Sequence, residues 1–427
     1  MENVDVLIIG AGPSGSVASA YLNKQNIKVL VLEKQKFPRF VIGESLLPHC
    51  MDHLSEVGFI DNIKKHGFQE KTGAAFYKGK HKTEFYFNDQ FSKGWSWTWQ
   101  VKRADFDNIL ISTAIEQGVE VKFECEVNSV DASSASEQTT TYTDKSGKSH
   151  TVKSKYIIDA SGYGRVLPRL FKLEEPVSTP PRGAVFCHIH DTKRTKAAGT
   201  NIFVHSFNEN SAWIWAIPFS DQTTSVGVVS NVELVDEFAA NNGAKFLNHI
   251  RTFGDLAGRF ENEQLVFEPR TIHNYAVRSK QLFGPGYVLC GNSTEFLDPV
   301  FSSGVTLATG SGLLAAKLTE KVLNGEQVNW AETYEEKLRR GIDVFRTFVL
   351  GWYNGDLQTI IYSDDIDSNI KKQICSVLAG YVWDTEKQSK TAKIIKIPPT
   401  SFTAIKDHYD FLGWSTTPDG AVLVDPT

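Results

Sequence analysis

A glycine-rich loop near the N-terminus constrains the fold more than any other feature of this sequence. Residues 10–15 read G-x-G-x-x-G. The preceding residues 5–9 form a short apolar run rich in β-branched side chains, which predicts a buried strand. Residues 16–26 have helical spacing, and residues 28–32 form a second apolar run. The segment therefore predicts a β-α-β unit of about 30 residues.

Such a loop is typical of dinucleotide binding. Glycines permit a tight turn and a close approach of the backbone to a pyrophosphate, and the helix N-terminus offers N–H groups and the positive end of its dipole. Glu33 follows the second apolar run, where it can accept hydrogen bonds from a ribose. A strand, turn and helix with incidental glycines is the alternative, but the complete pattern favours a nucleotide.

Composition narrows the class of protein. The chain has 427 residues, 41% of them hydrophobic, and a net charge of −5, which shows no bias toward nucleic acid or an acidic membrane surface. Its five scattered cysteines include no C-x-x-C pair, which argues against a metal framework and fits a reducing cytosol. Glu2 and Asp5 stand where a signal peptide would be basic, and no run of 18 apolar residues occurs. We expect a cytoplasmic protein without a membrane span.

A possible metal cluster is better explained as a helix. His49, Cys50 and His53 have helical spacing after Pro48, but no further ligand cluster accompanies them. We therefore expect no metal.

Two further segments indicate which dinucleotide binds. Residues 156–162 form a strand that runs into D-x-x-G, and residues 288–292 form a strand that ends in Gly291-Asn292. With these pieces the sequence resembles the FAD family of para-hydroxybenzoate hydroxylase and geranylgeranyl reductase. That family usually has Gly-Asp where this chain has Gly291-Asn292, and the aspartate holds the ribityl chain. Asn292 can still bond a hydroxyl but lacks the charge.

Arg103 matches the arginine that approaches the flavin phosphates in that family, although the residues alone favour an ordinary arginine at a helix start. The resemblance thus implies FAD. The residues expected to bind it are Gly10, Gly12, Pro13, Ser14, Gly15, Glu33, Lys34, Arg39, Glu44, Ser45, Arg103, Asp159, Gly162, Gly291, Asn292, Pro299 and Gly304.

Two motifs narrow the resemblance. Residues 213–218 fit W-x-W-x-I-P, and residues 296–304 fit F-x-x-P-x-x-S-x-G. Both are similar to the diagnostic motifs of flavin-dependent halogenases. Residues 37–48 and 67–74 are similar to segments of the branch that halogenates phenols and pyrroles, and the second segment carries that branch's catalytic lysine. The resemblance covers roughly the first 350 residues, judged by where the motifs fall.

The halogenase resemblance assigns roles to three places in the chain. It implies a halide site at Ser303 and Gly304, where a helix of small residues begins and backbone N–H groups can bind an anion. A plain capped helix, with Ser302 or Ser303 as the cap, is compatible with this. The tunnel wall beside the flavin would comprise Trp213, Trp215, Ile217 and Pro218, for which sheet core is the alternative. The catalytic residue would be Lys71.

Lys71 also has a plain interpretation as a solvated surface charge, because it lies among the lysines Lys64, Lys65, Lys78, Lys80 and Lys82.

One departure from the family bears on the substrate. Tryptophan halogenases have a glutamate immediately before the motif serine, whereas this chain has Phe301. The absent carboxylate favours a phenol or pyrrole, whose own hydroxyl or ring nitrogen activates it.

The fold expected from these segments is α/β, or α+β overall, with a Rossmann-like FAD-binding domain interleaved with a mixed β-sheet domain. We assign residues 1–75, 101–165 and 278–325 to the FAD-binding domain. Residues 76–100 and 166–277 form the substrate-side sheet domain, and residues 326–427 a mostly helical C-terminal region. We expect a turn region at 133–141, and strands with alternating apolar and polar residues at 183–230.

The expected function is halogenation of a phenol or pyrrole, free or tethered to a carrier protein, using reduced FAD, oxygen and chloride or bromide. The chain has no second glycine loop for NAD(P)H, which fits a separate flavin reductase as partner. Two alternatives stay open. One is a flavin monooxygenase or a dehydrogenase/reductase of the same fold without halide chemistry. The other is a non-catalytic flavin-binding protein.

Overall fold

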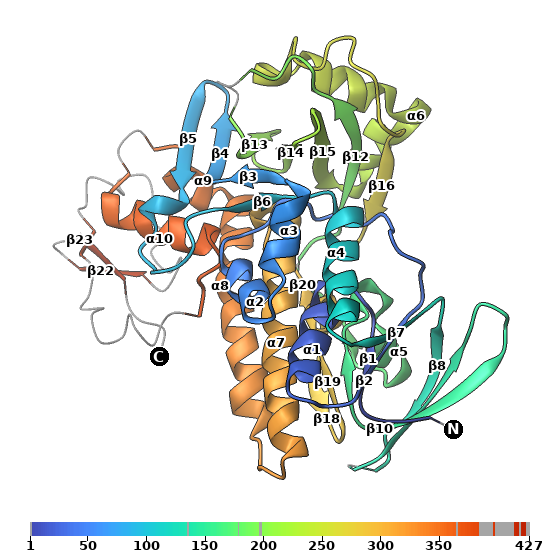
Figure 1. Cartoon of the computed structure of the whole chain (residues 1–427). Coiled ribbons are helices and arrows are strands. Elements are labelled where there is room, and N and C mark those ends of the chain that lie inside the picture. Colours follow the sequence, from blue (N-terminus) through green and yellow to red (C-terminus); the bar gives the residue numbers. More distant parts are fainter. Residues whose placement is uncertain are drawn as a thin grey trace. The chain divides into compact units, whose positions relative to one another are not determined.

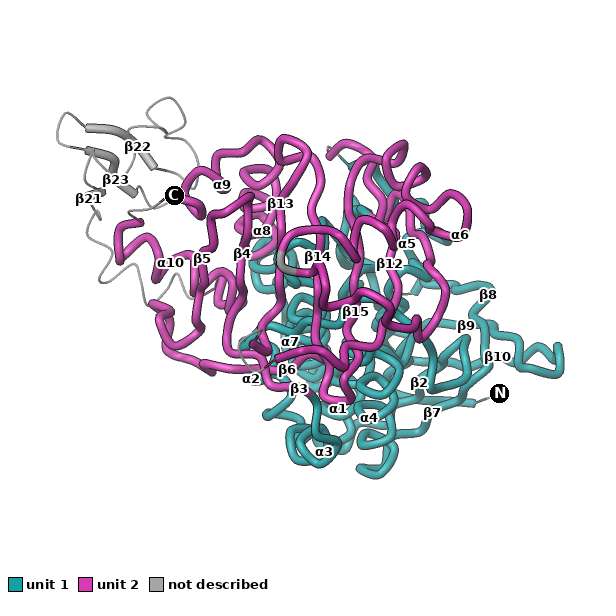
Figure 2. The backbone as a smooth tube through the Cα atoms, turned by 90° about the horizontal axis from the view of Figure 1, so that it is seen from above, with its two compact units in different colours: residues 1–68, 101–178, 276–339 teal, residues 69–100, 179–275, 340–427 magenta. Residues whose placement is uncertain are grey.

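The computed structural model describes residues 2–134, 136–177, 179–195, 199–363 and 366–383, and the backbone of three short C-terminal strands (Figure 1). The chain forms two compact units, each built from three separate stretches (Figure 2). Unit 1 comprises residues 1–68, 101–178 and 276–339, and unit 2 comprises residues 69–100, 179–275 and 340–427.

Unit 1 is built around a mostly parallel sheet with the strand order β18-β19-β10-β1-β2-β7. The predicted β-α-β unit is confirmed. It consists of β1 (Glu2–Ile9), α1 (Pro13–Lys24) and β2 (Val29–Glu33), and β1 and β2 pair in parallel. The other strands in this order are β7 (Glu120–Phe123), β10 (Ser149–Asp159), β18 (Phe283–Gly284) and β19 (Tyr287–Leu289), and two further strands join the sheet beside β10. Every residue of β2 is buried, as a parallel strand covered on both faces requires.

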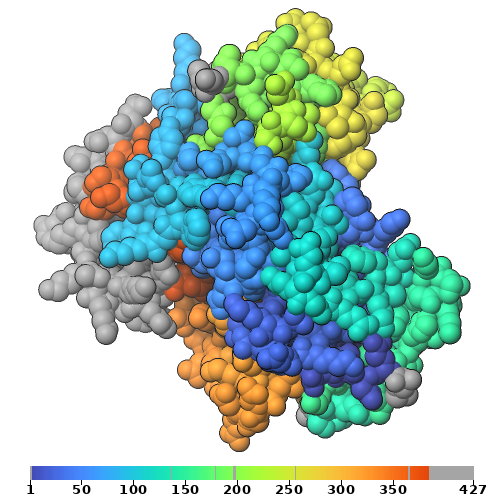
Figure 3. Space-filling model, in the orientation of Figure 1, coloured from blue at the N-terminus to red at the C-terminus, as the bar shows by residue number. Residues whose placement is uncertain are grey.

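Helices surround this sheet. They are α2 (His49–Glu56), α3 (Ile60–His66), α4 (Arg103–Glu116), α5 (Val166–Leu170) and α7 (Gly304–Leu323). The small residues of α7 are explained by its close packing on α1, because a Cβ at Gly312 would lie 2.5 Å from the carbonyl oxygen of Ser14. In Figure 3, side chains of α3 and α4 contribute to the blue and cyan surface of the unit that faces the viewer.

The prediction of a turn over residues 133–141 is partly wrong. Strand β9 (Gln138–Thr143) begins within it and pairs with β8 (Glu126–Asp131) and β10. Gln138, Thr140 and Tyr142 are buried in alternation with less buried residues. Threonine is β-branched and packs well on a half-buried sheet surface, so tertiary pairing outweighed the polar composition.

Unit 2 contains a seven-stranded mixed sheet with the order β16-β12-β15-β14-β13-β4-β5. Its strands are β4 (Gly73–Lys78), β5 (His81–Tyr86), β12 (Arg182–His190), β13 (Ile202–Phe207), β14 (Ala212–Pro218), β15 (Thr223–Asn231) and β16 (Arg270–His273). Only the β13–β4 pair of this sheet is parallel among the described residues. The sheet at 183–230 is confirmed. Strand β14 does not show the expected alternation of apolar and polar residues, because all of its residues are apolar and all are buried.

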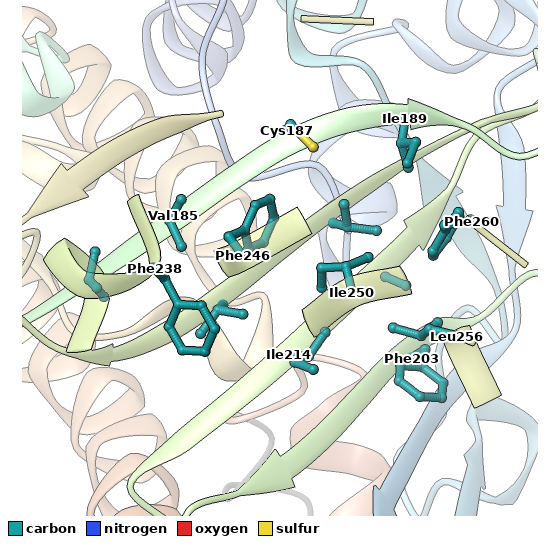
Figure 4. Packing of buried hydrophobic residues seen from close by; sticks show 14 residues of the cluster. Val185, Cys187, Ile189, Phe203, Ile214, Phe238, Phe246, Ile250, Leu256 and Phe260 are labelled. Carbon is teal, nitrogen blue, oxygen red and sulfur yellow. The ribbon is translucent and has the colours of Figure 1, made fainter. Parts of the chain in front are cut away.

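Helix α6 (Val232–Thr252) covers one face of this sheet. Phe238, Phe246 and Ile250 pack with alternate residues of the strands, including Val185 and Ile214 (Figure 4). Since side chains alternate across a strand, Trp213 and Trp215 of β14 lie on the opposite face from Ile214.

The C-terminal region is helical as far as residue 378, in agreement with prediction. A short π-helix at Ala331–Glu336 leads into α8 (Lys337–Asn354), followed by α9 (Asp356–Ile361) and α10 (Ser368–Leu378). The predicted polar tail lies largely outside the described residues, which beyond 383 include only the strands β21 (Lys396–Ile397), β22 (Trp414–Thr417) and β23 (Gly420–Leu423). Across the described residues, none of the helices combines the length and apolarity needed to span a bilayer.

Candidate active site

The loops that sequence analysis assigns to nucleotide binding meet at one edge of the unit 1 sheet. In register, Ile9 pairs with Leu32 and with Asp159, and Asp159 pairs with Leu289. The carboxyl ends of four neighbouring strands are therefore level. Residues 10–15, 160–162 and 291–292 follow three of these ends, and Glu33 ends the fourth. Ligands of open α/β sheets bind at this edge.

Each of the three glycines of the loop is explained by a different structural reason. Gly10 has a φ of +100°, and a Cβ there would lie 2.5 Å from the carbonyl oxygen of Ala160. A Cβ at Gly15 would lie 1.9 Å from the carbonyl oxygen of Gly10. At Gly12, by contrast, the only described atom within 4 Å would be Nη2 of Arg39, at 3.4 Å. Gly10 and Gly15 are therefore required for packing, whereas Gly12 leaves its backbone open to a ligand.

Glu33 fixes the glycine loop. Its buried carboxylate accepts hydrogen bonds from the backbone N–H of Ala11 (2.8 Å) and of Gln35 (2.8 Å). Each oxygen retains a lone pair that a ribose hydroxyl can use. Lys34, predicted to contact the cofactor, is exposed and forms an ion pair with Glu126 at 2.6 Å.

Two arginines share the buried carboxylate of Asp107. Arg103 donates to it through Nε (2.8 Å) and Nη2 (3.0 Å), and its Nη1 donates to the carbonyl oxygens of Ile42 (3.1 Å) and Gly43 (3.2 Å). Arg39 Nη1 donates to the same carboxylate at 2.9 Å. Arg103 thus supports the loop before Glu44 and Ser45, whereas Nη2 of Arg39 would lie 3.4 Å from a Cβ at Gly12 of the glycine loop. Sequence analysis missed Asp107, although its spacing of four from Arg103 on one helix is a usable signal.

The second and third loops are joined by a buried polar network. Asp159 accepts hydrogen bonds from the N–H of Ser161 (2.9 Å) and of Leu167 (2.7 Å), and from the hydroxyl of Ser293 (3.1 Å). Burial raises the pKa of its carboxyl group, and these hydrogen bonds oppose the rise. Arg165, buried and not predicted, donates to the carbonyl oxygen of Asn292 at 2.9 Å. Nothing in the spacing of the sequence pointed to Arg165.

The other predicted cofactor residues include two glycines with positive φ. Gly162 has a φ of +59°, and a Cβ there would have no described atom within 4 Å. Gly291 has a φ of +55°. Pro13 and Ser14 lie in the first turn of α1 and are buried. Ser45 is buried, and its hydroxyl has no hydrogen-bond partner in the part of the chain that the structure describes. An unpaired hydroxyl and an open backbone at Gly12 both fit a polar ligand at this edge.

The start of α7 lacks a side-chain cap. Asp298 caps the preceding turn by accepting from the N–H of Val300 at 3.0 Å, Pro299 begins that turn, and Ser302 has a φ of 56°. Ser303 is at the N-cap position, but its side chain makes no capping hydrogen bond. The expectation of a serine at the N-cap is therefore confirmed for Ser303, but in the described part of the chain its hydroxyl leaves the N–H groups of the first turn without a side-chain cap.

The two motif tryptophans lie on one face of β14 in unit 2. Trp213 donates from Nε1 to the hydroxyl of Tyr353 at 3.0 Å, and Trp215 donates from Nε1 to the hydroxyl of Ser225 at 3.0 Å. Their ring centroids are 5.9 Å apart. Ile217 and Pro218 are buried at the end of the strand. Both indoles are thus fixed by packing and by a hydrogen bond.

Gly227 is required by Trp215. A Cβ at Gly227 would lie 2.3 Å from the indole ring. We expect Gly227→Ala to displace this ring and to destabilise the protein by about 1–3 kcal/mol, as overpacking does. Chemical denaturation monitored by tryptophan fluorescence measures both effects. Because Trp215→Ala removes the clash, Gly227→Ala should cost little in that background, and equal costs in both backgrounds would contradict the assignment.

Lys71 ends the short strand β3 (Gln69–Lys71), which pairs antiparallel with β6 (Thr98–Gln100). Its side chain is only 1% exposed, and its Nζ lies 5.4 Å from the ring centroid of Phe87. The neighbouring lysines are exposed, except for Lys78, which is partly buried. Interpretation of Lys71 as a solvated surface charge is therefore wrong.

The helix interpretation of His49, Cys50 and His53 is confirmed, because α2 begins directly after Pro48. Among the described residues no group of three or more His, Cys, Asp or Glu side chains could hold a metal ion.

Comparisons with known proteins agree with this geometry. A family model described as "FAD binding domain" matches residues 3–228. The chain is 29% identical to 1H-pyrrole-2-carbonyl-[peptidyl-carrier protein] chlorinase of Pseudomonas fluorescens, over 93% of each chain. It is 30% identical to the corresponding brominase of Pseudoalteromonas luteoviolacea, over 76% of this chain and 79% of the relative.

Solved structures give the same fold. A flavoprotein/dehydrogenase from Cytophaga hutchinsonii is 48% identical with a TM-score of 0.88, over 92% of this chain and 96% of that one. The flavin-dependent brominase Bmp2 is 27% identical with a TM-score of 0.78, over 90% and 95%. The Rossmann-like FAD-binding fold, the cofactor FAD and the oxidoreductase class are thereby established. The chain belongs to the flavin-dependent halogenase family of FAD-binding enzymes.

Proposed function

We propose that this enzyme halogenates an electron-rich aromatic ring, a phenol or a pyrrole, at a site that contains Lys71. The observation that carries the proposal is the burial of Lys71, since a lysine that is 1% exposed amid exposed lysines is not explained by solubility. Its position on β3 coincides with the catalytic lysine of the halogenase segment it resembles.

In unit 1, the residues proposed to hold FAD are those that converge on the sheet edge. The open backbone of Gly12 and the N-terminus of α1 would receive the pyrophosphate, Arg39 would neutralise it, and Glu33 would accept from the ribose. Reduced FAD supplies the two electrons with which oxygen and halide form hypohalous acid. The uncapped N–H groups at Ser303 and Gly304 would hold the chloride or bromide ion.

In unit 2, Lys71 would position and polarise hypohalous acid. Its ammonium group donates a hydrogen bond to the oxygen of that acid, which makes the halogen more electrophilic. The aromatic ring then attacks the halogen. The new carbon–halogen bond forms as the oxygen–halogen bond breaks, and the hydroxide released combines with the ring proton as water. Trp213, Trp215, Ile217 and Pro218 would form the wall that separates this step from the flavin.

The substrate class is supported by the pyrrole-carbonyl carrier-protein substrates that the names of two relatives state. The residue before the motif serine is Phe301, so no carboxylate stands at this position to assist removal of the ring proton. The substrate's own N–H or O–H group would therefore activate the ring. We propose an acyl group tethered to a carrier protein as the natural form of the substrate, and a separate flavin reductase as the source of reduced FAD.

A second candidate is supported by the 48% identical structure described as a flavoprotein/dehydrogenase. On this alternative the enzyme oxidises or reduces its substrate without halide, and Lys71 has no role in halogen transfer.

One assay separates the two candidates. The purified enzyme is supplied with FAD, a flavin reductase, NADH, oxygen and either bromide, chloride or no halide, with free and carrier-tethered phenols and pyrroles as acceptors. Halogenated product, identified by mass and dependent on the halide, supports halogenation. Turnover of an acceptor to a hydroxylated, oxidised or reduced product at the same rate without halide would support the dehydrogenase or monooxygenase candidate instead.

A further inference from the structure

The strand opposite Lys71 carries two buried polar side chains that the function described so far does not use. In the β3–β6 pair, Lys71 is opposite Thr98 and Gln69 is opposite Gln100. Directly opposite residues of an antiparallel pair project their side chains to the same face, and alternate residues of one strand share a face. Thr98 and Gln100 therefore project to the same face of the pair as Lys71, and Trp99 projects to the other.

Both side chains are buried with an unsatisfied polar atom. Thr98 and Gln100 are each 0% exposed, and neither Oγ1 of Thr98 nor Oε1 of Gln100 has a hydrogen-bond partner in the described part of the chain. The amide nitrogen of Gln100 donates to the carbonyl oxygen of Thr200 at 3.4 Å, which leaves Oε1 as the unsatisfied end. Burying a polar atom without a partner is unfavourable, so such atoms in a native protein call for a ligand or another function.

We infer that Thr98 and Gln100 determine acceptor specificity by binding the N–H or O–H group of the aromatic substrate beside Lys71. This rests on the proposed function, because it places the acceptor at the face that carries Lys71. An amide oxygen can only accept a hydrogen bond, and a hydroxyl can accept or donate one. The preferred acceptor therefore carries a hydrogen-bond donor, as a phenol or a pyrrole does. Two residues of a strand span about 7 Å, comparable with one substituted ring.

The structure supplies a matched control in unit 1. Gln138 and Thr140 on β9 are also 0% exposed, and Oε1 of Gln138 and Oγ1 of Thr140 likewise have no partner among the described residues. The substitutions Thr98→Val and Gln100→Met can thus be compared with Thr140→Val and Gln138→Met. Each pair makes the same chemical change at the same burial, but only the first pair lies beside Lys71. Thr98→Ser retains the hydroxyl.

The experiment measures halogenation of a phenol and its O-methyl ether, and of a pyrrole and its N-methyl derivative, by each variant. A small diffusible trap reports hypohalous acid formation separately. We expect Thr98→Val and Gln100→Met to raise the KM of the donor-bearing acceptor about tenfold or more, with trap halogenation unchanged. We also expect these two variants to lose part of their preference for the donor-bearing ring over its methylated form. In Thr98→Ser, Thr140→Val and Gln138→Met, the KM of the donor-bearing acceptor should stay within about twofold of the parent value.

If Thr98→Val and Gln100→Met match their unit 1 controls in KM and in preference, the inference is wrong, even when Lys71→Ala abolishes halogenation. If Lys71→Ala halogenates like the parent, the proposed role of Lys71 fails instead. Binding of the unreacted phenol to the oxidised holoenzyme, measured by calorimetry, is the second readout. Weaker binding in Gln100→Met than in Gln138→Met supports the inference, and equal binding overturns it.

Discussion

Replacing Lys71 by alanine is expected to lower aromatic halogenation by about 100-fold or more, because a group that stabilises the developing charge in the transition state is lost. Oxidation of reduced FAD by oxygen should continue at the parent rate, since Lys71 is not among the residues predicted to bind FAD. Product analysis by mass spectrometry and stopped-flow absorbance of the flavin measure the two rates separately.

Burial of Lys71 makes a control necessary, since removing a buried charged side chain can alter packing. Lys71→Met keeps most of the volume and removes the charge. It should remain folded and be as inactive in halogenation as Lys71→Ala. Lys80→Ala, at an exposed lysine, should retain the parent rate. Halogenation by Lys71→Met at the parent rate would show that the buried amine is not needed.

Gly15→Ala and Gly12→Ala are expected to fail in different ways. At Gly15 the added Cβ meets the carbonyl oxygen of Gly10, whose backbone cannot move without disturbing the sheet edge. We expect a loss of about 3 kcal/mol or more in the free energy of unfolding. At Gly12 the Cβ meets only the flexible end of Arg39 in the described structure, so the apoprotein should change by less than about 0.5 kcal/mol.

Gly12→Ala, the variant expected to be the more stable of the two, is also the one in which we expect FAD binding itself to be impaired. Gly12→Ala places a methyl group where the pyrophosphate would approach the backbone, so we expect FAD to bind at least about tenfold more weakly. Thermal unfolding without FAD and fluorescence titration with FAD measure the two effects. A Gly12→Ala variant that binds FAD as tightly as the parent would refute the position assigned to the pyrophosphate.

The sequence was sufficient to predict those parts of the protein that depend on local pattern. The glycine loop between two apolar runs predicted the β-α-β unit, because helix and strand periodicity and the turn chemistry of glycine act over a few residues. Family motifs led to FAD and to the halogenase branch, which the comparisons confirm.

The tertiary structure decided what depends on partners distant in the chain. Lys71 reads as one surface lysine among several, and only its pairing with β6 and its contact with Phe87 show that it is buried. Arg165 forms a hydrogen bond with Glu174, nine residues away, but the loop carbonyl oxygens of Asn292 and Arg278 that it binds lie more than 100 residues away along the chain, so local pattern does not reveal its role. Alternation at 183–230 predicted strands, but only the folded structure shows that β14 is buried on both faces. Burial and hydrogen-bond partners are properties of the assembled chain, so local residue pattern cannot specify them.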